Sequence, residues 1–510
     1  MRKFDSNNPL FICDLANNHF GDVNHAKRII DELSHVAHET KALLSIKFQF
    51  RNLDKYIHKS FKDRRDLKFI DRFISTKLEK EDFHELADYI KAKKLVTMAT
   101  PFDEDGVDWC RELEIEIIKI ASASSNDYPL IDFVANAGKP VVASTAGLRI
   151  EEIDNLVFRL YGKVPQLTIM HCVAIYPCDD SALNLNQIST LQRRYPKLGI
   201  GFSTHERPDT LVPVTVATSL GAVALERHVG IRSEKYSLNE YSSQPHQIRE
   251  WIEASKRTIQ TLGPKNRPPA PINERETLND LKRGIFALRR INEGEKVDRA
   301  NTYLAFPLLW KEGQFHSGML TGELVATQDI EIDAPIGSSN CIESTRSIEN
   351  IIASVVLQPR GILADAKVEI NPEAKIELSH HYGLERFREF GTALITCYND
   401  EYAKKIVVQL PRQKHPYHFH KEKQETFQLL WGDMELTVNG TDHILQPGEL
   451  YTVNRGEWHK FHSLHGAVVE EISTRAIPGD SYYEDGSIAS LKLDQRKTPI
   501  PNWLRENRIS

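Results

Sequence analysis

Two apolar runs of the sequence each end in a histidine, and histidine is a common ligand of divalent metals. The first run lies in LGIGFSTHE and ends near His205, and the second lies in AVALERHVG and ends at His228. Two imidazoles leave coordination positions open for substrate oxygens, as a Lewis-acid metal site requires. If the fold brings the two runs together, we expect these side chains to share one divalent metal.

A second group of possible metal ligands lies near the C-terminus. His418 and His420 occur two residues apart in HFHKEKQETFQLLWG, which also contains Glu425, and His459 ends the later stretch GELYTVNRGEWH. Residues two apart on a strand point to the same face. Three imidazoles and one carboxylate suit Mn, Fe, Ni or Zn. We therefore predict a second metal site held by these four residues.

The elements that must position the first site repeat along residues 10–262. Each unit is a short apolar run followed by an amphipathic helical stretch. The eight runs are LFICDL, LLSIKFQF, LVTMATPF, IIKIAS, PVVASTA, LTIMHCV, LGIGFST and AVALERHV. Eight such units over roughly 250 residues predict an α/β fold, the (β/α)₈ TIM barrel. An open doubly wound sheet is the alternative, but no glycine-rich dinucleotide loop follows any run.

Polar residues end all eight runs, and barrel enzymes place their catalytic groups at the carboxyl ends of strands. Besides the two histidines and Glu226, the residues that we select are Asp14, Lys47, Gln49, Thr100, Lys119, Ser122, Ser144, Tyr176 and Ser203. Each alone has a structural explanation, such as a helix cap for serine or threonine. Together, the ammonium and hydroxyl donors predict a phosphorylated, anionic ligand.

The rest of the chain does not continue this repeating pattern. LGPKNRPPAPINERE contains four prolines and predicts a linker. A small β-rich segment follows at 276–345, and residues 346–510 show short alternating runs and turns that predict an all-β domain. We therefore expect three domains, at 1–265, 276–345 and 346–510.

The overall composition excludes several classes of protein. The net charge is −6 and no basic block occurs, which argues against a nucleic-acid partner. No segment approaches the ~18 consecutive apolar residues of a membrane span. The six cysteines are scattered, mostly in apolar runs, which predicts buried free thiols and a cytoplasmic protein.

Residues 1–265 resemble the sialic acid synthase family, whose members condense phosphoenolpyruvate with an aldose. The matching blocks follow the family's order: CDLANNHFGD, IKFQF, ATPFDEDGVDW, IKIASASSNDYPLI, GKPVVASTAGLRIEEI, MHCVAIYP, GFSTHE and ALERHVG. The resemblance implies that phosphoenolpyruvate is held by Lys47, Thr100, Lys119, Ser122, Ser144 and Ser203. It also implies Mn or Mg on His205 and His228, a catalytic role for Asp14 in place of a glutamate, and contact between Tyr176 and the acceptor.

Several residues depart from the family pattern, and most of these concern the acceptor. Ala123-Ser124 replaces the family's Gly-Glu, whose glutamate holds the acceptor sugar, and Ala174 replaces an asparagine. The segment at 276–345 resembles the family's antifreeze-like (SAF) domain, which implies a dimer in which this domain closes over a neighbouring barrel. Phe306 stands where that domain carries an arginine that reaches the neighbour's substrate. We expect the same chemistry on an acceptor other than N-acetylmannosamine.

The C-terminal residues resemble the cupin family, and IELSHHYGLERFREFGTALITCYN ahead of the motifs is similar to cupin sugar isomerases of the D-lyxose isomerase type. The resemblance implies that the cupin isomerises or epimerises the sugar that the barrel consumes. Glu435, Glu449 and His462 are candidates for the group that moves the proton.

The resulting hypothesis is a synthase of a 3-deoxy-2-ulosonic acid, similar to sialic acid, for surface polysaccharide biosynthesis. A sugar-binding or regulatory protein with relic sites is one alternative, since acceptor residues are lost. A pyruvate-dependent aldolase is another, in which Lys47 or Lys119 forms a Schiff base.

Overall fold

The computed structural model describes residues 4–264, 267–320, 324–343, 348–371 and 374–500. Two compact units divide at Pro268 and Pro269. Residues 265–266 of the predicted linker and the predicted domain boundary at 345–346 lie outside the described residues.

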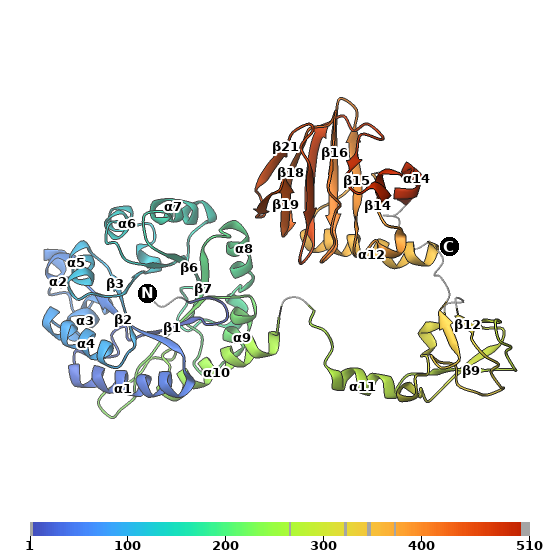
Figure 1. The fold of residues 1–510 in the computed structure, drawn as a ribbon. Coiled ribbons are helices and arrows are strands. Elements are labelled where there is room, and N and C mark those ends of the chain that lie inside the picture. Colours follow the sequence, from blue (N-terminus) through green and yellow to red (C-terminus); the bar gives the residue numbers. More distant parts are fainter. Residues whose placement is uncertain (1–3, 265–266, 321–323, 344–347, 372–373, 501–510) are drawn as a thin grey trace. The chain divides into compact units, whose positions relative to one another are not determined.

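The first unit contains a closed barrel in which each strand pairs with the next along the chain and β1 closes against β8 (Figure 1). The strands are β1 (Leu10–Asp14), β2 (Leu43–Phe50), β3 (Val96–Pro101), β4 (Ile117–Ile120), β5 (Val141–Ser144), β6 (Leu167–Cys172), β7 (Gly199–Ser203) and β8 (Ala224–His228). All of these pairs are parallel, so their carboxyl ends meet at one mouth. The predicted (β/α)₈ fold is confirmed.

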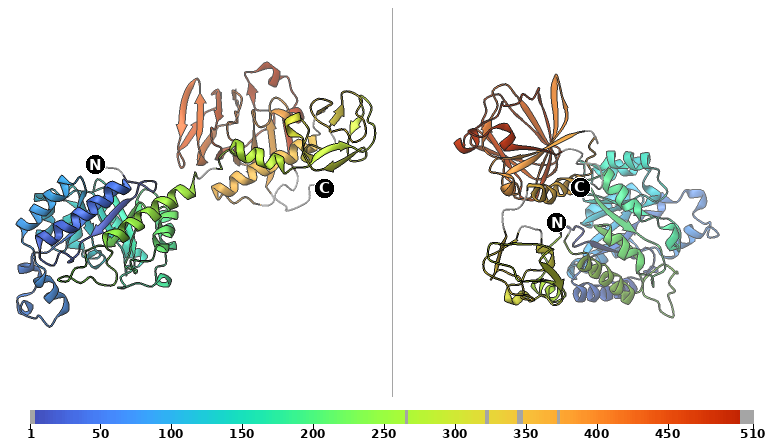
Figure 2. Two further views of the ribbon diagram at one scale, coloured as in Figure 1. Left: turned by 90° about the horizontal axis from the view of Figure 1, so that it is seen from below. Right: turned by 90° about the vertical axis from the view of Figure 1, so that its right-hand side faces the viewer.

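Helices surround this barrel (Figures 1 and 2). They are α1 (Val23–Thr40), α4 (Lys80–Ala92), α5 (Glu104–Glu112), α6 (Tyr128–Ala135), α7 (Ile150–Leu160), α8 (Asn186–Arg194), α9 (Val212–Ser219) and α10 (Pro245–Leu262). Two short helices, α2 (Leu53–Tyr56) and α3 (Lys68–Ser75), lie in the long connection after β2.

Apolar residues of the strands alternate between two cores. Leu10 and Ile12 of β1 belong to a cluster inside the barrel that also includes Met98 and Met170. The intervening Phe11 belongs to the larger cluster between strands and helices. Because both faces of each strand are buried, the runs read as nearly continuous apolar stretches.

The second unit begins with α11 (Ile272–Asp280) and two small sheets. Their strands are β9 (Gly284–Ala287), β10 (Lys296–Val297), β11 (Thr302–Ala305), β12 (Leu324–Ala326) and β13 (Cys341–Glu343). A separate cluster that includes Ile285, Val297 and Ile336 forms their core. Phe306, directly after β11, is 64% exposed.

Two larger sheets follow and form the predicted all-β fold. The seven-stranded sheet has the order β21-β18-β23-β16-β15-β14-β25, and the five-stranded sheet has the order β20-β19-β22-β17-β24. The bounds of the strands are β14 (Lys375–His380), β15 (Gly391–Asn399), β16 (Tyr402–Gln409), β17 (His418–Phe419), β18 (Glu425–Gly432), β19 (Met434–Val438), β20 (Thr441–Leu445), β21 (Leu450–Val453), β22 (His459–His462), β23 (Ala467–Thr474), β24 (Tyr482–Tyr483) and β25 (Lys497–Ile500). Phe427 and Leu429 of the first sheet share one core with Leu436 and Phe461 of the second.

A long helix, α12 (Ile348–Ala366), precedes these sheets and was not predicted (Figure 1). Ile351, Val355 and Leu363 pack with Ile376 and Ile406 of the seven-stranded sheet. Two short helices, α13 (Gly486–Ala489) and α14 (Leu493–Arg496), lie near the C-terminus.

Two predictions from composition can be compared with the described residues. None of their helices is both long and apolar enough to span a membrane. All six cysteines are free; five are buried as predicted, whereas Cys397 is only half-buried.

Candidate functional site

The first candidate site lies at the carboxyl ends of β1, β2 and β8, where register places three charged residues side by side. Asp14 is level with Lys47 on one side and with His228 on the other. The Lys47 ammonium lies 3.0 Å from Asp14 Oδ2 and also contacts the Glu226 carboxylate. All of these side chains except His228 are almost fully buried. Lys47 therefore holds two carboxylates together at the mouth of the barrel.

A second ammonium group extends this cluster toward β5. Lys119 Nζ lies 3.7 Å from Glu226 Oε2 and donates a hydrogen bond to Ser144 Oγ at 2.6 Å. Lys119 is 2% exposed, and the facing Ser144 is equally buried. Two ammonium groups and two carboxylates thus form one buried network.

Opposite charges decide the protonation states in this network. Burial raises the pKa of Asp14, but the charge of Lys47 and its hydrogen bond to Asp14 outweigh burial and hold that pKa below its ordinary value. Burial also raises the pKa of Glu226, and Lys119 and Lys47 likewise reverse the effect. Burial lowers the pKa of Lys119, which Glu226 opposes only in part. Both carboxyl groups are therefore ionised at neutral pH.

The two barrel histidines lie next to each other. The ring centroids of His205 and His228 are 5.4 Å apart. His205 Nδ1 lies 2.9 Å from the carbonyl oxygen of Val173, so Nε2 is the nitrogen left for another ligand. Burial lowers the pKa of His205 to about 4 and also lowers the pKa of His228. Neutral imidazoles are the form that binds a metal, so this pair fits a divalent metal.

Aromatic rings flank the histidine pair. The Tyr176 ring centroid is 4.1 Å from that of His205, and the Tyr176 side chain is 52% exposed. Tyr241, from the loop after β8, packs against Tyr176 and stands perpendicular to His228 with centroids 5.3 Å apart. These rings border the open side of the site.

The remaining predicted residues also lie at strand ends. Gln49 Nε2 donates to Asp14 Oδ2 at 3.3 Å. The hydroxyl groups of Ser122 and Ser203 both approach the Cys172 thiol, and Ser122 Oγ accepts a hydrogen bond from the backbone of Ala146. Thr100 Oγ1 is buried without a hydrogen-bond partner among the described residues. The structure thus gathers the predicted barrel residues around one mouth.

Sequence reasoning assigned no role to three residues of this site. Glu226 was recognised at a strand end but was given no role, although it joins both lysines. Tyr241 and Arg51 were not selected. Arg51 follows IKFQF directly, and its place two residues beyond Gln49 was the available signal.

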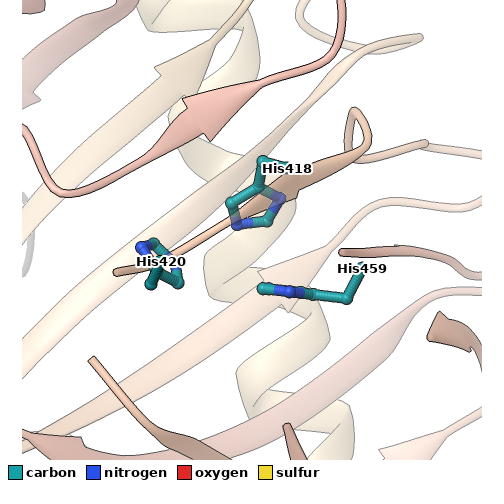
Figure 3. Close-up of side chains that lie close together, drawn as sticks. All are labelled: His418, His420 and His459. Atoms are coloured by element: carbon teal, nitrogen blue, oxygen red, sulfur yellow. The ribbon is translucent and has the colours of Figure 1, made fainter. Parts of the chain in front are cut away.

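The second candidate site lies between the two large sheets. Figure 3 shows His418, His420 and His459 converging, and their ligand atoms all lie within 4.8 Å of one another. His418 of β17 pairs with His459 of β22, and His420 lies directly after the end of β17 at Phe419. In the described part of the chain, no other group of three or more His, Cys, Asp or Glu side chains meets this criterion.

Backbone carbonyls fix the orientation of the three imidazoles. The Nδ1 atoms of His418 and His459 each lie 3.1 Å from a carbonyl oxygen, that of Pro416 and of Glu457. His420 Nδ1 contacts the carbonyl oxygen of Asp480. These contacts leave Nε2 as the ligand atom, as is usual for a histidine that binds a metal.

Glu425, the fourth predicted ligand, also faces the cluster. Its Oε2 lies 3.1 Å from His459 Nε2, and its Oε1 lies 3.5 Å from His420 Nε2. The buried Lys423 ammonium contacts the same carboxylate and lies 3.2 Å from Glu471. Burial raises the pKa of Glu425, but Lys423 and His420 reverse this and keep it well below the ordinary value. The four residues fit a divalent transition metal.

A cavity of about 60 Å³ borders this cluster, and its lining includes His418, His420, Glu425, Lys423 and Tyr483. The three proton-transfer candidates do not line it. Glu435 and His462 line a separate cavity of about 380 Å³. Glu449 instead accepts a hydrogen bond from the backbone of Gln446.

Comparison with known proteins gives two family matches. The NeuB family model matches residues 35–267, and a cupin domain model matches residues 405–473. A crystal structure of a protein from Chromobacterium violaceum, named as a spore coat polysaccharide biosynthesis protein E, is 40% identical, with a TM-score of 0.62. The match covers 66% of this chain and 99% of that one.

Two relatives with named roles were also found. Spore coat polysaccharide biosynthesis protein SpsE of Bacillus subtilis is 28% identical over 358 residues, which are 64% of this chain and 92% of that protein. Human N-acetylneuraminate-9-phosphate synthase is 27% identical over 301 residues, which are 56% of this chain and 80% of the human protein.

Proposed function

Because the chain belongs to the NeuB family, the sialic acid synthase family that its sequence resembles, we propose that its barrel condenses phosphoenolpyruvate with an aldose. The products are a 3-deoxy-2-ulosonic acid, similar to sialic acid, and phosphate. One observation carries the proposal: Lys47 and Lys119 place two buried ammonium groups, with the Ser144 hydroxyl, at one mouth of the barrel. Buried cations of this kind favour a multiply charged ligand.

In the proposed reaction, the methylene carbon of phosphoenolpyruvate attacks the aldehyde carbon of the acceptor. Water then adds to the middle carbon, and the tetrahedral intermediate loses phosphate. Lys47 and Lys119 neutralise charge that moves onto the leaving phosphate. Asp14, which Lys47 keeps ionised, accepts a hydrogen bond from the attacking water and takes its proton. Mn or Mg on His205 and His228 would supply Lewis-acid activation of the acceptor carbonyl.

The acceptor side of the site supports a sugar other than N-acetylmannosamine. Ser124 and Ala174 replace a glutamate and an asparagine of the family pattern, and Phe306 replaces an arginine. The contacts proposed for phosphoenolpyruvate remain, which supports the same chemistry on another aldose in surface polysaccharide biosynthesis.

A screen of aldoses for phosphate release from phosphoenolpyruvate, with products read by mass spectrometry, tests the proposal. We expect one aldose class to give a product whose mass is that of the aldose plus pyruvate. His205→Ala and His228→Ala should each abolish turnover. If no aldose in the screen leads to phosphate release, a sugar-binding or regulatory protein with relic sites is supported instead. Borohydride trapping of pyruvate on a lysine would support the aldolase.

We further propose that the cupin isomerises or epimerises the sugar that becomes the acceptor. Three converging imidazoles and the Glu425 carboxylate support a resident Mn, Fe, Ni or Zn ion. Such an ion would stabilise negative charge on adjacent sugar oxygens. The variant His418→Ala/His420→Ala should fail with the ketose and condense the aldose at a near-normal rate. Equal rates on both sugars would make the cupin a binding domain.

We also propose a homodimer in the cytoplasm. The resemblance of residues 276–345 to a domain that closes over a neighbour, together with the exposed Phe306, supports an apolar contact between copies. The free cysteines suit a reducing compartment. Light scattering at micromolar concentration should give at least the dimer mass, and a monomer would contradict it.

A further inference from the structure

Arg51 is a cation at the barrel mouth that has no carboxylate partner among the described residues. It directly follows β2, and its guanidinium lies 3.6 Å from the ring centroid of Phe102 and 4.2 Å from that of Phe73. Its Nε is buried and has no hydrogen-bond partner, and no ion pair with Arg51 occurs among the described residues. Stacked arginines in such surroundings keep their N–H donors available in the ring plane.

A half-buried arginine without a carboxylate partner is unusual, because a charge removed from water costs free energy unless it is paired. Burial lowers the pKa of Arg51, but only to about 10, so the group stays charged at neutral pH. An anionic ligand that pairs with Arg51 would offset the free energy lost by removing its charge from water.

Hydrogen bonds connect Arg51 to the proposed reaction centre. Arg51 Nη2 donates to Gln49 Oε1 at 3.1 Å, and Gln49 in turn donates to Asp14. Lys119 reaches Asp14 from the other side, through Glu226 and Lys47. In this network Asp14 lies between Arg51 and the groups proposed to hold phosphoenolpyruvate.

Helix α3 supplies a second unpaired arginine. Arg72 precedes Phe73, is exposed, and forms no ion pair within the described ranges. The ring of the adjacent Phe73 stacks on the Arg51 guanidinium, with its centroid 4.2 Å away. Arg72 therefore lies on the helix whose Phe73 side chain packs against Arg51.

Neighbouring basic residues of the same connection behave differently. Lys55 lies 2.7 Å from Asp105, Arg64 lies 2.6 Å from Asp66, and Arg65 pairs with Asp71. These three cations have carboxylate partners within reach, whereas Arg51 and Arg72 form no ion pair with a described residue.

We propose that Arg51, supported by Arg72, binds an anionic group of the acceptor aldose, a phosphate or a carboxylate. This inference rests on the proposed function and specifies its acceptor class. A guanidinium presents paired N–H donors that match either anion. Arg51 lies at the opposite end of the network from Lys119, with Asp14 between them, and this position assigns the anion to the acceptor and not to phosphoenolpyruvate.

The full-length protein with Mn tests this inference. Aldohexoses and 2-acetamido aldohexoses are each supplied as the neutral sugar, the 6-phosphate and the uronic acid, and phosphate release from phosphoenolpyruvate is measured. We expect the 6-phosphate or the uronic acid to exceed its neutral counterpart at least tenfold in kcat/KM, and the better of the two identifies the anion. Faster turnover of the neutral sugars would overturn the inference and leave the proposed function standing. If no sugar is turned over, both the inference about the acceptor and the proposed function are contradicted.

Variants then test the residue itself. Arg51→Gln should raise KM for the charged acceptor at least tenfold and leave KM for the neutral sugar unchanged. Its Kd for phosphoenolpyruvate, measured by calorimetry, should stay within twofold of wild type, which also shows that the barrel is folded. Arg72→Gln should act in the same direction but less, and Arg64→Gln is the matched control. An equal loss for charged and neutral acceptors, or a loss of phosphoenolpyruvate binding, would overturn the assignment.

Discussion

At the scale of single residues, Lys119 gives the sharpest test of the proposed phosphoenolpyruvate site. Lys119→Met removes one charge-assisted contact, worth about 1.5–3 kcal/mol, and should weaken phosphoenolpyruvate binding at least tenfold. Glu226 keeps Lys47 as its partner in this variant, so the barrel should still fold. Calorimetric titration checks the affinity, and the exposed Lys163→Met is the control. Unchanged affinity in Lys119→Met would contradict the role.

The sequence predicted which residues reach the mouth but not how they pair. Lys47 and Lys119 were predicted to hold phosphoenolpyruvate, because the sequence places both near the ends of apolar runs. Their pairing with Glu226 depends on how β2, β4 and β8 are placed in the closed barrel, and this placement is not visible in the sequence. Arg51 was missed for a similar reason. Its aromatic neighbour Phe73 lies on α3, a helix that the repeating pattern of the sequence did not predict.

At the scale of elements, α12 shows where pattern reasoning failed. The run IIASVVL is rich in β-branched residues, and we expected strands from residue 346 onward. Ile351, Val355 and Leu363 instead recur at intervals of four and eight, which places them on one helical face against the seven-stranded sheet. Burial against that sheet outweighs the weak intrinsic preference of these residues.

The turn between β18 and β19 gives a prediction about the cupin. Gly432 has a φ of +87°, and a Cβ there would lie 1.9 Å from the carbonyl oxygen of Gly466. Gly440 has a similar φ of +82° but open space around it. Gly440→Ala should therefore cost about 1 kcal/mol of unfolding free energy, from backbone strain alone. Gly432→Ala should cost clearly more, because two backbones must separate. Denaturant unfolding of both variants measures the difference, and equal losses would contradict the close approach.

At the scale of the whole molecule, each unit contains a buried histidine that makes it sensitive to acid. Burial lowers the pKa of His19 to about 4 and that of His381 to about 3, from an ordinary value of 6.5. The unfolded chain therefore binds more protons as pH falls below 6.5, and stability is lost down to the folded pKa. Each residue should cost about 2 kcal/mol by pH 5.

Scanning calorimetry between pH 7.5 and 5 measures this effect. His19→Gln should flatten the pH dependence of Tm for the first unit only, and His381→Gln that of the second. The exposed His84→Gln should leave both slopes unchanged. A slope that is the same in all variants would show that other groups control the acid response.

The buried network at the barrel mouth contains as many ammonium groups as carboxylates, so its resting charge is zero. A ligand with two or three negative charges cannot take over Lys47 and Lys119 without leaving Asp14 and Glu226 short of cations. Two carboxylates that lose their partners in a dry site gain affinity for protons. Phosphoenolpyruvate should thus be taken up together with protons, and its heat of binding should depend on the ionisation enthalpy of the buffer.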